Sequence, residues 1–270
     1  IMADATGLLE ARGEIDWRGE RMTSQGKAVI TDLDYASLLG PVQGINSTIN
    51  FGDLLPLSTK SPQLMTVEAI DIGLELFFGE ALFSIGSDGQ IIIEDATWPW
   101  AGGEIGIRRT PIALSDEPQD ISLYVQDVQL EEVFLMLDVD GLSGSGVLAG
   151  DLPATLTPGG VLIENGHFES LDGGVLQYIG AASEAGKQDE GSALMFNALE
   201  NFEYDALEVT VSGNTTDVLE IAIRLEGRNQ EVLDGYPMKF NINTEGPLLE
   251  MFKKSTAGYR LPEKVQEQFE

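Results

Sequence analysis

The chain has 270 residues, no cysteine, and 15 basic against 45 acidic residues, which gives a formal net charge of -30. A chain this acidic is repelled by phosphate backbones, so nucleic acid is a poor partner. The absence of cysteine excludes a disulfide framework and a thiolate metal site. No run of about 18 apolar residues occurs, so the chain as given is expected to be soluble; its start at Ile1 suggests a fragment whose signal or anchor lies elsewhere.

The first half of the chain alternates between apolar and polar residues, which is typical of half-buried strands because strand side chains point to opposite faces with period two. A hairpin is expected around Ser87-Asp88-Gly89, because an apolar run ends at residue 85 before this turn and another begins at residue 91 after it. Residues 35–42 are ambiguous and could form one helical turn, and residues 53–63, with two prolines, are expected to be a loop. Strands are predicted at residues 9–17, 28–33, 45–51, 70–76, 82–85, 91–93, 105–107 and 121–125.

The middle of the chain is less regular. Residues 129–138 are the best helix candidate, since their apolar positions recur at helical spacing. Residues 180–192 are small and polar and are expected to form a mobile loop. Short strands are predicted in the glycine-dense stretch 141–174 and just after it, at residues 147–148, 152–156, 161–163 and 175–178.

The longest stretches of alternating apolar and polar residues, which would form strands with one apolar face, lie between residues 201 and 252. Residues 219–225 and 236–243 alternate strictly, whereas the apolar parity of residues 202–211 changes near Ala206, which predicts a bulge or two short strands. Beyond Gly246-Pro247 the pattern predicts a short helix over residues 248–252, which would close the end of these C-terminal strands.

Together these elements predict an all-β fold with two or three short helices. The expected architecture is an elongated, curled and mostly antiparallel sheet that forms an apolar groove. Residues 1–255 are predicted to be one domain, with any sub-boundary near residues 110–120, and residues 256–270 to be a polar, flexible tail.

Residues able to carry out chemistry are sparse. His167 is the single histidine and has no Gly-x-Ser-x-Gly elbow to serve, so a structural position in a strand or turn is the better interpretation. Residues 141–146 are rich in glycine but no Walker lysine follows them. The acidic residues form no carboxylate pair or calcium loop that can be picked out. The sequence therefore predicts no catalytic residue, no metal, no cofactor and no enzyme activity.

The aromatic and apolar strand faces leave alternatives open. Trp98 and Trp100 could form a platform for sugar stacking, although alternating aromatics beside a proline more often pack in a core. The apolar faces could form an ordinary closed core against a second sheet, or an open groove that holds acyl chains. Composition alone favours the closed core.

Five stretches of the sequence carry a resemblance when they are taken in order: residues 142–146 with 150–153, 163–168, 198–207, 225–229 and 235–243. Together they resemble the YdbH family of Gram-negative envelope proteins within the wider AsmA-like/TamB group. The sequence departs from the family pattern at Gln230, where proline is expected. This difference concerns the geometry of the turn that follows residues 227–229. The similarity matches the family's C-terminal domain, long labelled "dicarboxylate transport", and extends more weakly back to about residue 40.

The resemblance implies a bridge across the periplasm, with an inner-membrane anchor outside this chain and a long β-groove that carries phospholipids between the two membranes. It also implies that the C-terminal end meets a small outer-membrane lipoprotein resembling YnbE, by strand addition to an exposed sheet edge. The label "dicarboxylate transport" has no support, because a dicarboxylate site needs a basic cluster and the arginines are scattered. A non-transporting envelope scaffold or adhesive β module with a closed core is the alternative.

Two sets of site residues follow as hypotheses from the shared parity of the C-terminal strands. The groove is expected to be lined by Leu207, Val209, Val211, Leu219, Ile221, Ile223, Leu225, Tyr236, Met238, Phe240 and Ile242. The edge that receives a partner strand is expected to comprise Tyr236, Met238, Lys239, Phe240, Asn241, Ile242 and Asn243.

Overall fold

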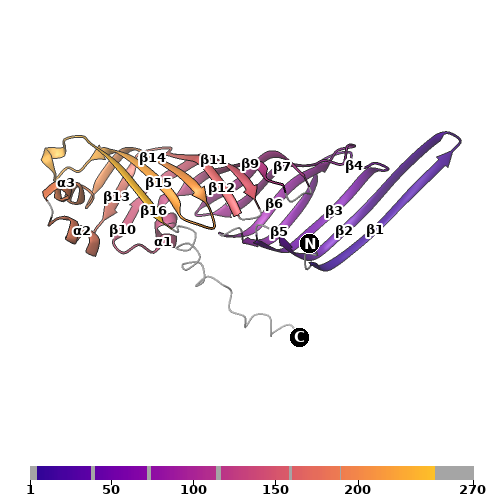
Figure 1. Ribbon diagram of the computed structural model, residues 1–270, viewed down its shortest axis with the longest axis horizontal. Coiled ribbons are helices and arrows are strands. Elements are labelled where there is room, and N and C mark those ends of the chain that lie inside the picture. Colours follow the sequence, from indigo (N-terminus) through magenta and orange to yellow (C-terminus); the bar gives the residue numbers. More distant parts are fainter. Residues whose placement is uncertain are drawn as a thin grey trace, which may run out of the picture.

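The structure is a computed structural model that describes residues 5–37, 40–71, 74–113, 117–157, 160–188 and 190–246. It is 71% strand and 10% helix, and its strands form one large antiparallel sheet of 16 strands that does not close. The sheet is elongated and twists along its length, with the N-terminal strands at one end and the helices α2 and α3 at the other (Figure 1). The prediction of an elongated, antiparallel all-β fold is therefore confirmed.

Most strands pair with their neighbours in sequence. In the first half of the chain β3 pairs with β5 as well as with the short β4, and the other exceptions lie in the second half. There β9 pairs with β11 and β12 with β14, while β13 bridges β10 and the start of β14. The strands of the first half are β1 (Ala5–Arg18), β2 (Arg21–Ser37), β3 (Gly40–Leu54), β4 (Leu57–Thr59), β5 (Gln63–Asp71), β6 (Glu75–Ile85), β7 (Ile91–Trp100), β8 (Gly103–Ile112) and β9 (Gln119–Gln129). Those of the second half are β10 (Leu142–Ser145), β11 (Val147–Thr157), β12 (Gly160–Ser170), β13 (Gly174–Tyr178), β14 (Phe202–Asn214), β15 (Leu219–Arg228) and β16 (Met238–Gly246).

The short helices lie between strands of the second half: α1 (Leu130–Leu137), α2 (Ala181–Gly186), α3 (Glu190–Ala198) and a 3-10 turn, η1 (Leu233–Gly235). Helix α1 confirms the helix predicted at residues 129–138 and ends at Asp138, whose φ is 49°. The loop predicted at residues 180–192 is wrong, because α2 and α3 occupy most of it. Its small residues let the two helices approach closely: a Cβ at Gly186 would lie 1.9 Å from a ring atom of Phe196.

Other boundaries also differ from expectation. The helical turn considered for residues 35–42 is wrong, since β2 runs to Ser37 and β3 begins at Gly40. The predicted bulge is confirmed as a register shift between Tyr204 and Ala206 in the β14–β15 pair. Strand β16 begins two residues later than expected and leaves Tyr236 outside it. The helix predicted at residues 248–252 and the tail 256–270 lie outside the described residues.

One face of the sheet carries mainly apolar residues from β1 to β16, and we call it the apolar face; the opposite side is the polar face. The strand register defines the apolar face as two adjacent rows of directly paired residues. The first row runs from β1 to β11 through Leu9, Ile30, Ser47, Met65, Ala81, Ala96, Ile107, Leu123 and Leu152. The second row runs from β7 to β16 through Trp98, Ile105, Val125, Gly150, Phe168, Val209, Ile223 and Ile242.

Candidate apolar binding face and free sheet edge

The C-terminal strands β14, β15 and β16 bring the predicted groove residues together on the apolar face. Their register aligns Leu207, Leu225 and Phe240 in one row. The next row along the strands holds Val209, Ile223 and Ile242, as described above. The bulge in β14 keeps Phe202 and Tyr204 on the same face as Leu207, because the extra residue offsets the change of parity. Of the predicted set, Tyr236 alone lies outside these strands and is 70% exposed.

The burial of these residues divides the predicted groove set in two. Leu207 and Leu225 are 3% and 1% exposed and belong to a closed cluster with Phe202, which is 0% exposed. Val211, Leu219 and Ile221 are also buried, in a neighbouring cluster. By contrast Val209, Ile223, Met238, Phe240 and Ile242 are only half-buried. The second group therefore keeps apolar surface that a ligand can reach.

The closed cluster is covered by helices. Phe134 of α1 and Met195 of α3 pack against it, as do Leu176 and Tyr178 of β13. The rings of Phe202 and Phe240 meet inside it with their centroids 5.2 Å apart. This end of the apolar face is therefore filled by the protein's own side chains.

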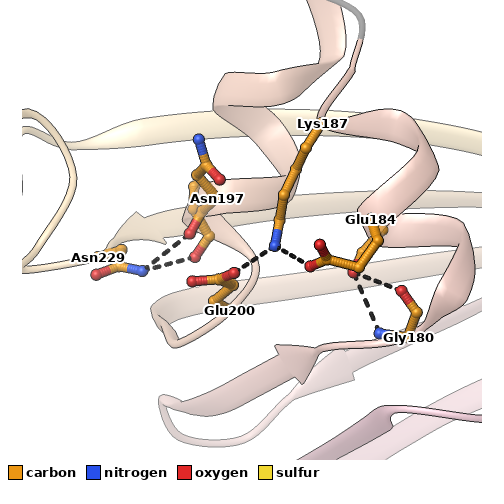
Figure 2. A network of polar contacts seen from close by, with 8 residues as sticks. Gly180, Glu184, Lys187, Asn197, Glu200 and Asn229 are labelled. Atoms are coloured by element: carbon orange, nitrogen blue, oxygen red, sulfur yellow. Dashed lines mark hydrogen bonds and ion pairs between the residues drawn. The ribbon is translucent and has the colours of Figure 1, made fainter.

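A polar network ties the covering helices to the sheet (Figure 2). Lys187 at the end of α2 pairs with the carboxylates of Glu184 and Glu200, and these hydrogen bonds raise the pKa of the Lys187 amine. Asn229, which follows β15, is 2% exposed and its Nδ2 donates to the carbonyl oxygens of Asn197 and Ala198 at 3.3 and 3.0 Å. The Asn229 amide thus satisfies carbonyls at the C-terminal end of α3 that have no partner within the helix.

The opposite end of the apolar face is uncovered. Leu9, Ile15 and Trp17 of β1 are 66%, 56% and 75% exposed. These three residues stand an even number of positions apart, so their side chains point to the same face of the strand. Each is paired with a residue of β2. The strands β1 to β3 extend beyond the rest of the sheet at this end (Figure 1). The apolar face is therefore closed at its C-terminal end and open at its N-terminal end.

Strand β16 forms an edge of the sheet, because among the described residues it pairs with β15 alone. Its Lys239, Asn241 and Asn243 side chains are exposed on the polar face. Lys239 forms an ion pair with Glu226 at 2.8 Å, and hydrogen bonds from Lys239 and then Arg224 lower the pKa of the Glu226 carboxyl. The predicted edge residues from Met238 to Asn243 thus lie together on β16, and Tyr236 precedes it.

The polar face carries a cluster that sequence patterns did not single out. Arg108 forms an ion pair with Asp151 at 2.8 Å and lies 4.6 Å from the ring centroid of Tyr124. Burial, and then the charges of Asp95 and Glu104, raise the pKa of the Tyr124 phenol to about 12. A hollow of about 430 Å³ here also includes His167. The exposed His167 lies in β12 opposite Asp151, in the strand position expected for it.

In the described parts of the chain, no group of three or more His, Asp or Glu side chains is placed to hold a metal ion. Trp98 is 7% exposed and packs in a cluster of β6 and β7, as expected for a core residue. None of the helices described is long and apolar enough to span a membrane.

The chain matches the YdbH-like family, described as intermembrane phospholipid transport protein YdbH, over residues 1–270. No curated protein and no solved structure matches it at a significant level of similarity.

Proposed function

Because the chain belongs to the YdbH-like family of intermembrane phospholipid transport proteins, we propose that its apolar face is a groove segment of a bridge that carries phospholipids between the inner and outer membranes. The family's function identifies phospholipid as the cargo and the Gram-negative envelope as the location. The bridge would span the periplasm, held at the inner membrane by an anchor outside this chain.

The observation that carries this proposal is the continuity of the apolar face. The two rows of paired residues overlap on β7 to β11 and together reach from β1 to β16. An acyl chain laid along such a surface leaves water, which stabilises it by about 0.8 kcal/mol for each buried methylene. Binding of this kind needs neither a nucleophile nor a cofactor. The acidic polar face would keep a protein with this exposed apolar surface soluble.

The half-buried members of the predicted groove set would line the path at its C-terminal end. Val209, Ile223 and Ile242 form one cross-strand row there, and Met238 and Phe240 lie beside it on β16. Helices α1 and α3 cover Leu207 and Leu225. These two residues would therefore form the end wall of the groove that holds the lipid.

Replacing Ile223 by aspartate should remove most of the phospholipid that co-purifies with the protein, because a carboxylate in the path must lose its hydration when acyl chains cover it. The measurement is lipid extraction and mass spectrometry on protein purified from bacterial cells without detergent. Ala222→Asp is the matched control, since Ala222 is exposed on the polar face of the same strand. A folded wild-type protein free of lipid would instead favour the scaffold function.

We further propose that the edge of β16 receives a strand from a small outer-membrane lipoprotein resembling YnbE. An edge strand presents unpaired N–H and C=O groups to such a partner. The faces of β16 set the pattern that the added strand must have. Apolar residues of the added strand would continue the two rows that end at Phe240 and at Ile242, and its polar residues would lie beside Asn241 and Asn243.

A photo-crosslinking residue placed at Asn243 should give adducts with a small envelope lipoprotein in cells. The same residue at Glu220 is the control, because Glu220 is also exposed but lies on β15, which is paired on both sides. Adducts are expected from Asn243 and not from Glu220. Products confined to the chain itself at both positions would contradict a partner strand at β16.

A further inference from the structure

The acidic residues of the chain are not confined to the polar face, because several lie along one border of the sheet. The antiparallel order places the connections β7–β8, β9–β11, β12–β14 and β15–β16 at the same border, together with the helices α1, α2 and α3. We call it the helix border, and it is the lower border in Figure 1. Its connections carry the exposed carboxylates of Glu131, Glu132, Asp138, Asp140, Asp172, Glu231 and Asp234.

No described basic side chain neutralises these carboxylates. None of them forms an ion pair within the described part of the chain, unlike the polar-face carboxylate of Glu226. Lys187 is the one basic residue in the described connections of the helix border, and it is already paired with Glu184 and Glu200. The helix border therefore carries a net negative charge with no internal counter-charge.

The opposite border of the sheet is also acidic over most of its length. Its turns between β6 and β15 expose Asp88, Glu117 and Asp217. The basic residues Arg18 and Arg21 lie only at the turn between β1 and β2, at the N-terminal end of the sheet. A ligand on the apolar face between β6 and β16 thus has acidic residues at both borders.

Helix α1 brings two of these carboxylates onto the apolar face itself. Its Val133 packs on the cluster formed by β6 and β7, and its Phe134 packs on the closed C-terminal cluster. Glu131, Glu132 and Leu135 are exposed and share the remaining side of the helix, because residues three and four positions apart are neighbours there. Leu135 is 65% exposed. The outer side of α1 thus combines an accessible apolar side chain with two carboxylates.

The helix dipole does not cancel this charge. The N-terminus of a helix is equivalent to about half a positive charge, whereas Glu131 and Glu132 in the first turn supply two full negative charges. The net field at this end of α1 therefore attracts cations and repels anions.

Resting on the proposed function, we propose that the helix border selects phospholipids whose headgroup carries a cationic amine over those whose headgroup has a net negative charge. A lipid whose acyl chains lie on the apolar face beside α1 keeps its phosphate in water, because burying an unpaired charge is strongly unfavourable. Its headgroup then lies near the exposed carboxylates, which attract an ammonium group. In water of low ionic strength, each carboxylate about 10 Å from that charge changes the relative affinity by about twofold.

The test is a competition between two lipids with identical acyl chains. The complete chain is incubated with vesicles of equal parts dioleoyl phosphatidylethanolamine and dioleoyl phosphatidylglycerol, and the lipid on the re-isolated protein is measured by mass spectrometry. In about 10 mM salt we expect a roughly fivefold excess of the ethanolamine lipid. In about 1 M salt, where charges are screened within about 3 Å, the ratio should fall to about one.

Replacing Glu131 and Glu132 together by glutamine should lower the excess in low salt to roughly twofold, with the total bound lipid unchanged. The matched control replaces Glu80 and Glu220 together by glutamine. Both are exposed on the polar face, so the control removes the same two charges from the opposite side of the sheet. The control variant should keep the roughly fivefold excess of the wild type.

The possible outcomes separate this inference from the proposed function. Equal amounts of the two lipids on the wild type in low salt would overturn the inference and leave the proposed function standing. An equal loss of preference in both double variants would overturn the role of the helix border, since the net charge of the whole chain would then be the cause. A wild-type protein that takes up neither lipid would overturn the proposed function itself. The wild-type measurements at the two salt concentrations test the headgroup preference even if the variant at Glu131 and Glu132 does not fold.

Discussion

Phe202→Ala is expected to lower the free energy of unfolding by about 3 to 5 kcal/mol. Phe202 is 0% exposed at the start of β14, and its ring meets that of Phe240 with centroids 5.2 Å apart. Strands and helices surround it on the closed C-terminal cluster, so the structure cannot collapse easily into the space that alanine would leave. Urea denaturation followed by circular dichroism measures the change.

Tyr236→Ala is the control for this prediction. Tyr236 is also aromatic and lies in the same region of the chain, but it is 70% exposed. Its replacement should change the free energy of unfolding by no more than about 0.5 kcal/mol. If the two variants unfolded at the same urea concentration, the closed cluster would not be a core, and the division of the apolar face into closed and open parts would fail.

The alternation of residues predicts which side of each C-terminal strand is apolar, because period two depends only on the strand backbone. Ile223 and Leu225 therefore appear equivalent in the sequence. They differ in the structure because Leu225 lies in the cluster beneath α1 and α3 and Ile223 lies at its margin. Such burial depends on contacts between segments distant in sequence, which strand periodicity does not contain.

The helices α2 and α3 illustrate the same limit. Residues 180–192, which form α2 and the start of α3, are mostly small and polar and therefore indicate a loop when the sequence is read alone. Their stability comes from tertiary contacts: Ser183 is 0% exposed, and Lys187 joins α2 to Glu200 beyond α3. Tertiary packing of this kind overrides local propensity.

The position of β16 at an edge of the sheet was predictable in part. The absence of a further alternating run after residues 236–243 indicates an edge, and the structure describes no second partner for β16. The packing of the Trp98 indole against Gly79 of β6 was not predictable from the sequence, because only the folded sheet brings these two residues together.

Asn229→Asp is expected to lower the free energy of unfolding by about 3 kcal/mol or more at neutral pH. The Asn229 Nδ2 group donates to two carbonyl oxygens at the end of α3, and its Oδ1 accepts from the backbone N–H of Glu231 at 2.9 Å. Aspartate removes both donated bonds and places a buried carboxylate against the two carbonyl oxygens. Urea denaturation measures the loss, and hydrogen exchange should show that α3 loses protection first.

The pH dependence distinguishes this cause from simple loss of packing. Burial and the facing carbonyls would raise the pKa of the new carboxyl in the folded state above its ordinary value of about 3.9. The folded variant then binds a proton more tightly than the unfolded chain. The loss in its free energy of unfolding, relative to the wild type, should therefore be smallest at about pH 4 and grow as the pH rises. Asn241→Asp, at an exposed site on β16 opposite Arg224, should show no such trend. A deficit of Asn229→Asp that is constant with pH would mean that the amide acts by filling space, and that the helices over the closed end are held by packing alone.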